Sequence, residues 1–186
     1  GEDKLVLNFI SRLVLQKGIY EVVAAVKNLA PEFPKMRLHV VGNIDKNSPE
    51  SITQDFIDQH QDENVNFLGR RKDIAELLAI TDLYVFPSYY REGLPRTCLE
   101  ALATGLPIIT TDMPGCNLCI DEGLNGYLIE PKSIEKVENA IRRICEDNSI
   151  ERMGLHSRKI AEERFQNKLV YQQIEAKYRE IFANPS

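Results

Sequence analysis

The sequence predicts an α/β fold in which a parallel sheet of about six strands carries helices on both faces and is followed by a C-terminal helical tail. Short apolar runs alternate with helical patterns up to about residue 130, the order found in proteins built from strand–helix–strand units. The runs are almost continuously apolar, as parallel strands are when both faces are buried. No internal repeat and no shift in composition marks a boundary, so we expect one domain over residues 1–186.

The expected strands are six short runs that are separated by turn and helix signals. They span residues 5–10, 37–42, 65–69, 83–88, 108–111 and 127–129. Right-handed crossovers between parallel strands would bring their carboxyl ends to one edge of the sheet. Loops that follow strands are therefore the places to search for functional residues.

The helices are predicted from apolar residues that recur with a period near 3.6. Pro95 suits the first position of the helix after the fourth strand, and Gly105 is expected to end that helix. Asp73 is the expected N-cap of a helix over residues 74–80. The remaining helical patterns cover residues 22–29, 50–61, 133–147 and 149–182, the last as two helices or one kinked pair.

Charge and hydropathy exclude several classes of protein. The formal net charge is −5 with both signs interspersed, which argues against a nucleic-acid partner. No apolar run reaches the ~20 residues of a membrane span, and the start shows no signal-peptide pattern. The four cysteines are too few and too scattered for a disulfide scaffold, so we expect a reducing cytoplasm. A chain that opens almost directly on a strand fits a fragment of a longer protein as well as a natural start.

Several motifs are weighed and set aside. Cys116 and Cys119 have C-x-x-C spacing, but no second ligand pair stands near them, so we expect packed side chains and no metal. His39 lies within the second strand and is expected to be a hydrogen-bonded structural side chain. Tyr89 and Tyr90 offer either a stacking surface or loop packing. The dinucleotide fingerprint, the P-loop and the nucleophile elbow are all missing.

The main candidate site is the segment EGLPRTCLE at residues 92–100, between the fourth strand and the following helix. A strand end, a glycine turn and a helix start form the usual ligand crevice of an open parallel sheet. The first amides of the helix have no partner inside it, so they suit a phosphate. Arg12 and Lys17 follow the first strand, at the same edge of the sheet. Two cations there suit a diphosphate; solvated surface charges are the alternative.

Two other charged groups have open interpretations. Glu100 lies off the apolar face of its helix, so it either pairs with Arg96 one turn away or turns toward the strand ends. Arg70, Arg71 and Lys72 follow the third strand. They form either a solvated loop or the border of a base or phosphate.

The spacing of Glu92 and Glu100 resembles the E-x7-E motif of retaining glycosyltransferases of the GT-B architecture, notably glycosyltransferase family 4. The motif is embedded in a longer similarity, with FPS before it and EALATGLPII after it. The other matching segments are RL, KG, VVG, FLG, NGYL and Pro131, in family order. Together they cover about residues 5–180 and resemble the C-terminal, donor-binding domain of that family, which has a Rossmann-like sheet.

The resemblance implies a role for each matching position. Arg12 and Lys17 would hold the diphosphate of a nucleotide sugar, and Glu100 would accept hydrogen bonds from the ribose. Backbone groups at the start of the helix would also help to bind the diphosphate, at Leu94, Pro95, Arg96 and Thr97. The family needs no metal and no cofactor, because cations and helix amides stabilise the leaving diphosphate.

The same resemblance places the sugar and the base. Glu92 would be the catalytic residue and would contact the transferred sugar together with Gly93 and Leu94. Arg70 and Arg71 would border the base. The segment looks most like bacterial enzymes that extend surface polysaccharides or lipid-linked oligosaccharides, which use mainly UDP-hexose donors and also GDP-mannose.

The chain departs from the family in two loops and in its length. Ser11 stands where a glycine is frequent, and Asn43 to Lys46 replaces a glycine-rich turn. The N-terminal domain is absent from these 186 residues. That domain supplies the glycan or lipid-linked acceptor site and a membrane-facing surface, so we expect a cytoplasmic enzyme at the inner face of the membrane. This chain alone is expected to bind a donor without transferring its sugar.

Two alternatives remain open. A nucleotide-sugar epimerase of similar architecture would bind the same ligand and use carboxylates for proton transfer. A non-catalytic α/β interaction domain would leave Arg12, Lys17, Glu92 and Glu100 as ordinary surface charges. Nucleotide binding separates the second alternative from the others.

Overall fold

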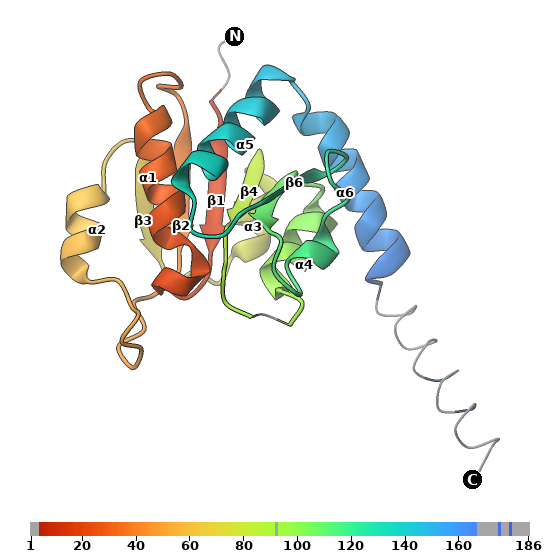
Figure 1. The fold of residues 1–186 in the computed structure, drawn as a ribbon, viewed down its shortest axis with the longest axis horizontal. Coiled ribbons are helices and arrows are strands. Elements are labelled where there is room, and N and C mark those ends of the chain that lie inside the picture. Colours follow the sequence, from red (N-terminus) through yellow and green to blue (C-terminus); the bar gives the residue numbers. More distant parts are fainter. Residues whose placement is uncertain (1–3, 92, 167–174, 176–178, 180–186) are drawn as a thin grey trace.

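The computed structural model describes residues 4–91, 93–166, 175 and 179. Its described part contains one six-stranded sheet, and all strand pairs are parallel (Figure 1). The strands run in the order β3-β2-β1-β4-β5-β6. Their bounds are β1 Val6–Ile10, β2 Arg37–Val41, β3 Val65–Gly69, β4 Leu83–Phe86, β5 Ile108–Thr111 and β6 Gly126–Ile129. The predicted α/β fold with six parallel strands is confirmed.

Helices cover both faces of this sheet. On one face α1 packs against α5, and on the other α4 packs against α3 and α6 (Figure 1). The helices are α1 Ile19–Leu29, α2 Gln54–His60, α3 Ile74–Ala79, α4 Arg96–Thr104, α5 Ile134–Glu146 and α6 Ile150–Arg164. Two short 3₁₀ helices, η1 Leu15–Lys17 and η2 Asn117–Cys119, lie at the carboxyl edge of the sheet.

The core explains why the central strands are so apolar. Every residue of β1, β4 and β5 is buried, because helices cover both faces of these strands. Strand order reverses between β1 and β4, since the chain leaves β1 toward one edge and β4 toward the other. The helices that follow these two strands, α1 and α4, therefore lie on opposite faces of the sheet, and open α/β sheets bind their ligands at such a reversal.

Some predicted boundaries were wrong. The fourth strand ends at Phe86, before the predicted end at residue 88. The helix predicted from residue 50 begins at Gln54, because the Thr53 hydroxyl caps its start by accepting a hydrogen bond from the Phe56 amide. Pro95 is the extended N-cap of α4, one residue before the predicted position. Of the segment predicted as helical over 149–182, α6 spans Ile150–Arg164, and most residues after 166 lie outside the described part.

Asp73 occupies the predicted N-cap position of α3 without acting as a side-chain cap. Its carboxylate instead accepts two hydrogen bonds from the Arg71 guanidinium, one of them at 2.8 Å. A bidentate guanidinium contact is stronger than a single hydrogen bond from an amide, so the carboxylate pairs with Arg71 and does not cap the helix. Gly105 ends α4 in the left-handed conformation, φ 81°, as predicted.

In the part of the chain that the structure describes, no helix is long and apolar enough to cross a lipid bilayer.

Candidate functional site

The crevice between β1 and β4 is lined by two loops that are bonded to each other. The amides of Tyr89 and Tyr90 both donate to the Gln16 carbonyl, at 2.9 and 3.2 Å. Gly18 adopts φ 81° so closely against Pro87 that a Cβ there would stand 2.4 Å from the Pro87 carbonyl oxygen. The loop after β1 and the loop after β4 therefore form one wall of defined geometry.

Lys17 is a buried cation at this wall, with 8% of its surface exposed. Its ammonium lies 4.8 Å from the centre of the Tyr90 ring and 5.9 Å from that of Phe86. Burial lowers the pKa of Lys17, and the nearby Arg12 charge lowers it further. The interpretation of Lys17 as a solvated surface charge was therefore wrong. A buried ammonium at strand ends is more typical of a functional site than of a surface.

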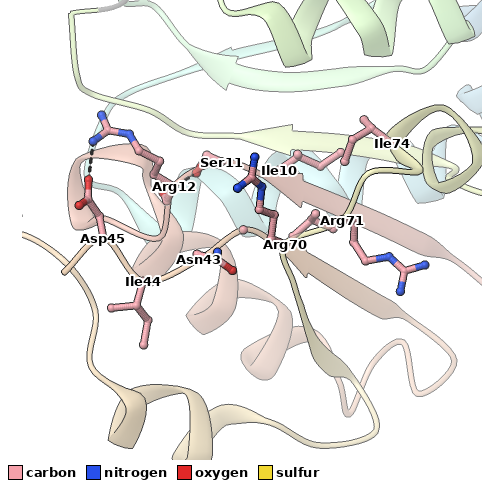
Figure 2. Close-up of a pocket in the computed structure, with 11 residues that line it drawn as sticks. Ile10, Ser11, Arg12, Asn43, Ile44, Asp45, Arg70, Arg71 and Ile74 are labelled. Atoms are coloured by element: carbon pink, nitrogen blue, oxygen red, sulfur yellow. Dashed lines mark hydrogen bonds and ion pairs between the residues drawn. The ribbon is translucent and has the colours of Figure 1, made fainter. Parts of the chain in front are cut away.

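Arg12 lies on the other side of the β1 end and is mostly exposed. Its Nη1 atom lies 2.7 Å from Oδ2 of Asp45, in the loop after β2. The guanidinium holds the pKa of that carboxyl below its usual value. Figure 2 shows Arg12 turned toward Asp45 at the rim of a cavity of about 440 Å³.

This cavity lies at the carboxyl ends of β1, β2 and β3. Arg70 and Arg71 both border it, as does the apolar side chain of Ile74. In Figure 2 Arg70 is directed toward Ser11, whereas Arg71 points away and is held by Asp73. The position of both arginines at one cavity agrees with the predicted base-adjacent loop. Whether a base binds there stays a prediction.

The start of α4 follows the loop after β4. The Pro95 carbonyl accepts hydrogen bonds from the Cys98 and Leu99 amides at 3.0 and 3.2 Å. Within the described residues, no backbone acceptor is recorded for the amides of Arg96 and Thr97. These two amides are the helix-start donors that an anion would meet.

Glu100 pairs with Arg96, with Oε1 3.2 Å from Nε, as one of its two interpretations predicted. It lines a groove of about 520 Å³ between α4 and α6, separate from the 440 Å³ cavity. Tyr84 is buried, and its hydroxyl donates to the Ile10 carbonyl at 3.3 Å. Burial raises the pKa of that hydroxyl. The predicted ribose contact of Glu100 stays untested.

Glu92, the predicted catalytic residue, lies outside the described residues. Gly93, beside it, borders open space. Of the predicted site residues in the described part, the structure gathers Arg12, Arg70 and Arg71 at one cavity and leaves Glu100 in the neighbouring groove.

The sequence argument missed Asp45 and Tyr84. The rule that selected Arg12, a charged residue just after a strand, could have selected Asp45 as well. Tyr84 gives no such signal, because it reads as one more apolar strand residue. Tyr89 and Tyr90 are loop-packing residues here, with their rings against Lys132 and Lys17.

The set-aside motifs have plain structural roles. Cys116 and Cys119 are buried free thiols, as predicted, and no group of three metal-binding side chains occurs among the described residues. The predicted hydrogen bonding of His39 is not seen at its Nδ1 atom, which is buried and finds no partner in the described part of the chain.

Comparison with known proteins gives a consistent result. The family described as "Glycosyl transferases group 1" matches residues 1–163. Among curated proteins, the chain is 26% identical over 178 residues to the capsular polysaccharide biosynthesis glycosyltransferase CapM of Staphylococcus aureus. It is 31% identical over 184 residues to the N-acetyl-alpha-D-glucosaminyl L-malate synthase of Bacillus anthracis.

Among solved structures, Anabaena HepE in complex with UDP superimposes with a TM-score of 0.85 at 26% identity. That match covers 95% of this chain and 49% of HepE. The two curated matches cover 95% and 97% of this chain and 46% and 47% of the relatives, so the chain spans about half the length of these proteins. On its sequence match and its fold, the chain belongs to the group 1 glycosyl transferase family.

Proposed function

We propose that this chain is the donor-binding domain of a retaining glycosyltransferase of family 4, and that it binds a nucleoside-diphosphate sugar at the carboxyl ends of β1 and β4. UDP-sugars are the first choice of donor, since HepE was solved with UDP. An N-terminal domain outside these 186 residues would bring a polysaccharide or lipid-linked acceptor at the inner face of the cytoplasmic membrane.

The observation that carries the proposal is the buried side chain of Lys17 in the loop after β1. Arg12 and Lys17 follow β1, and Arg96 and Thr97 open α4 after β4, so these groups lie on the two segments that flank the reversal of strand order. Cations and helix-start amides are the groups that bind phosphate oxygens in proteins. They would stabilise the negative charge that develops on the leaving diphosphate as the glycosidic bond breaks, without a metal ion.

Glu92 is the proposed catalytic residue and would contact the transferred sugar with Gly93 and Leu94. Glu100 would accept the ribose hydroxyls once it releases Arg96. An exposed i,i+4 pair of this kind contributes only a few tenths of a kcal/mol, so its release costs little. Neither role needs a change in the backbone of α4.

The test is a calorimetric titration of the chain with UDP, GDP and ADP. We expect one of the three, most favourably UDP, to bind and to raise the melting temperature. Glu100→Gln should weaken that binding about tenfold, because hydrogen bonds to a charged acceptor are worth about 1.5–3 kcal/mol. The 2′-deoxy nucleotide should lose less from the same substitution, since it offers one hydroxyl fewer.

A matched control is Glu162→Gln, which removes a carboxylate from the opposite wall of the same groove. It should leave nucleotide affinity unchanged. Equal losses in both variants would contradict the ribose role of Glu100. Binding of none of the three nucleotides would favour the non-catalytic interaction domain, and proton exchange at the sugar of a bound donor would favour the epimerase.

A further inference from the structure

Asp45 is a firmly held charged group at the rim of the 440 Å³ cavity. Its amide donates to the Ser51 hydroxyl oxygen at 2.8 Å, and that hydroxyl donates to the Leu13 carbonyl at 3.0 Å. The Asn47 amide donates to its Oδ1 atom at 3.1 Å. The loop after β2 therefore presents the Oδ2 atom of Asp45 in a fixed place.

Arg12, the partner of Asp45, is the free-moving half of the pair. Its side chain is 61% exposed, against 20% for Asp45. Its backbone is anchored through the Val14 amide, which donates to the Arg12 carbonyl at 2.9 Å, and its guanidinium pairs with Asp45 within the described residues. A long exposed side chain changes rotamer easily, so the guanidinium can leave a carboxylate that cannot follow it.

The charges around this pair favour such an exchange when a diphosphate arrives. Arg12 is close enough to Lys17 to lower its pKa, so the two cations repel each other in the empty crevice. Asp45 offsets part of this repulsion by drawing the guanidinium to the rim. A diphosphate bound beside Lys17 would offer Arg12 an acceptor of higher charge, and guanidinium–phosphate contacts favour two parallel bonds.

We propose that Asp45 is a positioning residue that holds Arg12 at the rim of the cavity and releases it to the diphosphate of the incoming donor. The inference rests on the proposed function, since it takes a nucleoside diphosphate as the ligand. Asp45 belongs to the loop after β2, which the Ser51 hydroxyl holds in place. When the donor binds, Arg12 would exchange the carboxylate of Asp45 for the diphosphate.

The consequence is a measurable loss of affinity in the native protein. Asp45→Asn leaves the loop contacts of the backbone in place and removes the competing charge. Exposed ion pairs are weak, so we expect UDP to bind roughly two- to fivefold more tightly to this variant. Uridine, which carries no phosphate, should bind equally to both proteins, and UMP should show a smaller gain than UDP.

The experiment is a set of calorimetric titrations of the full 186-residue chain with uridine, UMP and UDP. The proteins are the native chain, Asp45→Asn, Arg12→Ala and the double variant. In the Arg12→Ala background the gain from Asp45→Asn should disappear, because no guanidinium is left to release. Glu32→Gln, which removes an acid paired with Arg142, controls for net charge and should not change UDP affinity.

The outcomes separate the two proposals. An equal gain in the Arg12→Ala background would mean that Asp45 only repels the diphosphate, and would overturn the positioning role. Unchanged or weaker UDP binding by Asp45→Asn would overturn it too. Failure of the native chain to bind UDP would instead contradict the proposed function on which the inference rests.

Discussion

Replacing Lys17 by methionine is expected to weaken UDP binding by about 10- to 100-fold. Methionine keeps the length and the apolar stem that packs near Phe86 and Tyr90. The ammonium is lost, and a charge-assisted bond to phosphate is worth about 1.5–3 kcal/mol. The change in stability is a separate effect, in which the loss of the contacts with both rings opposes the removal of a buried charge. Calorimetry with UDP and thermal melts without ligand measure the two effects separately.

The matched control for this variant is Lys27→Met on α1. Lys27 pairs with Asp62 at the end of the molecule away from the crevice. We expect it to keep native affinity for UDP. A Lys17→Met protein that binds UDP as tightly as the native chain would show that Lys17 is a structural cation only, held by its aromatic neighbours.

Gly42→Ala is expected to destabilise the chain by at least about 3 kcal/mol, the largest effect on stability that we predict for a single methyl group. Gly42 has φ 150°, and a Cβ there would stand 1.7 Å from the Ser11 carbonyl oxygen. The clash is with backbone, so one of the loops that carry Arg12 and Asp45 must move. Denaturant unfolding of the variant measures the loss, and UDP affinity should fall with it.

Gly69→Ala is the control for backbone strain. Gly69 also has a positive φ, 63°, but a Cβ there meets nothing within 4 Å. Its cost should be limited to the conformational penalty, about 1 kcal/mol. Equal losses of stability in the two variants would contradict the claim that the close approach of the two loops at Gly42 leaves no room for a Cβ.

The sheet was predictable because strands that are buried on both faces form nearly continuous apolar runs in the sequence. Five of the six strands differ from the prediction by no more than one residue at either end, and β3 and β5 agree at both ends. The misplaced ends were set by side-chain hydrogen bonds, such as the Thr53 cap of α2, which compete with periodicity and leave no pattern in a single sequence.

The site was predictable to the level of loops and not of contacts. Position after a strand identified Arg12 and Lys17, but it could not tell that one is exposed at the rim and the other buried against Tyr90. That difference depends on where the loop after β4 crosses the loop after β1, which is a tertiary property. Asp45 follows a strand as Arg12 does, so only its pairing with Arg12 required the folded chain.

A crystal structure of the chain with UDP tests the central claim most directly. The account predicts that the diphosphate oxygens lie within hydrogen-bond distance, about 2.7–3.2 Å, of the Lys17 ammonium and the Arg96 and Thr97 amides. Arg12 should have left Asp45 for the phosphate, and the ribose should lie at Glu100. A diphosphate bound away from Lys17, with the Arg12–Asp45 pair intact, would contradict the account.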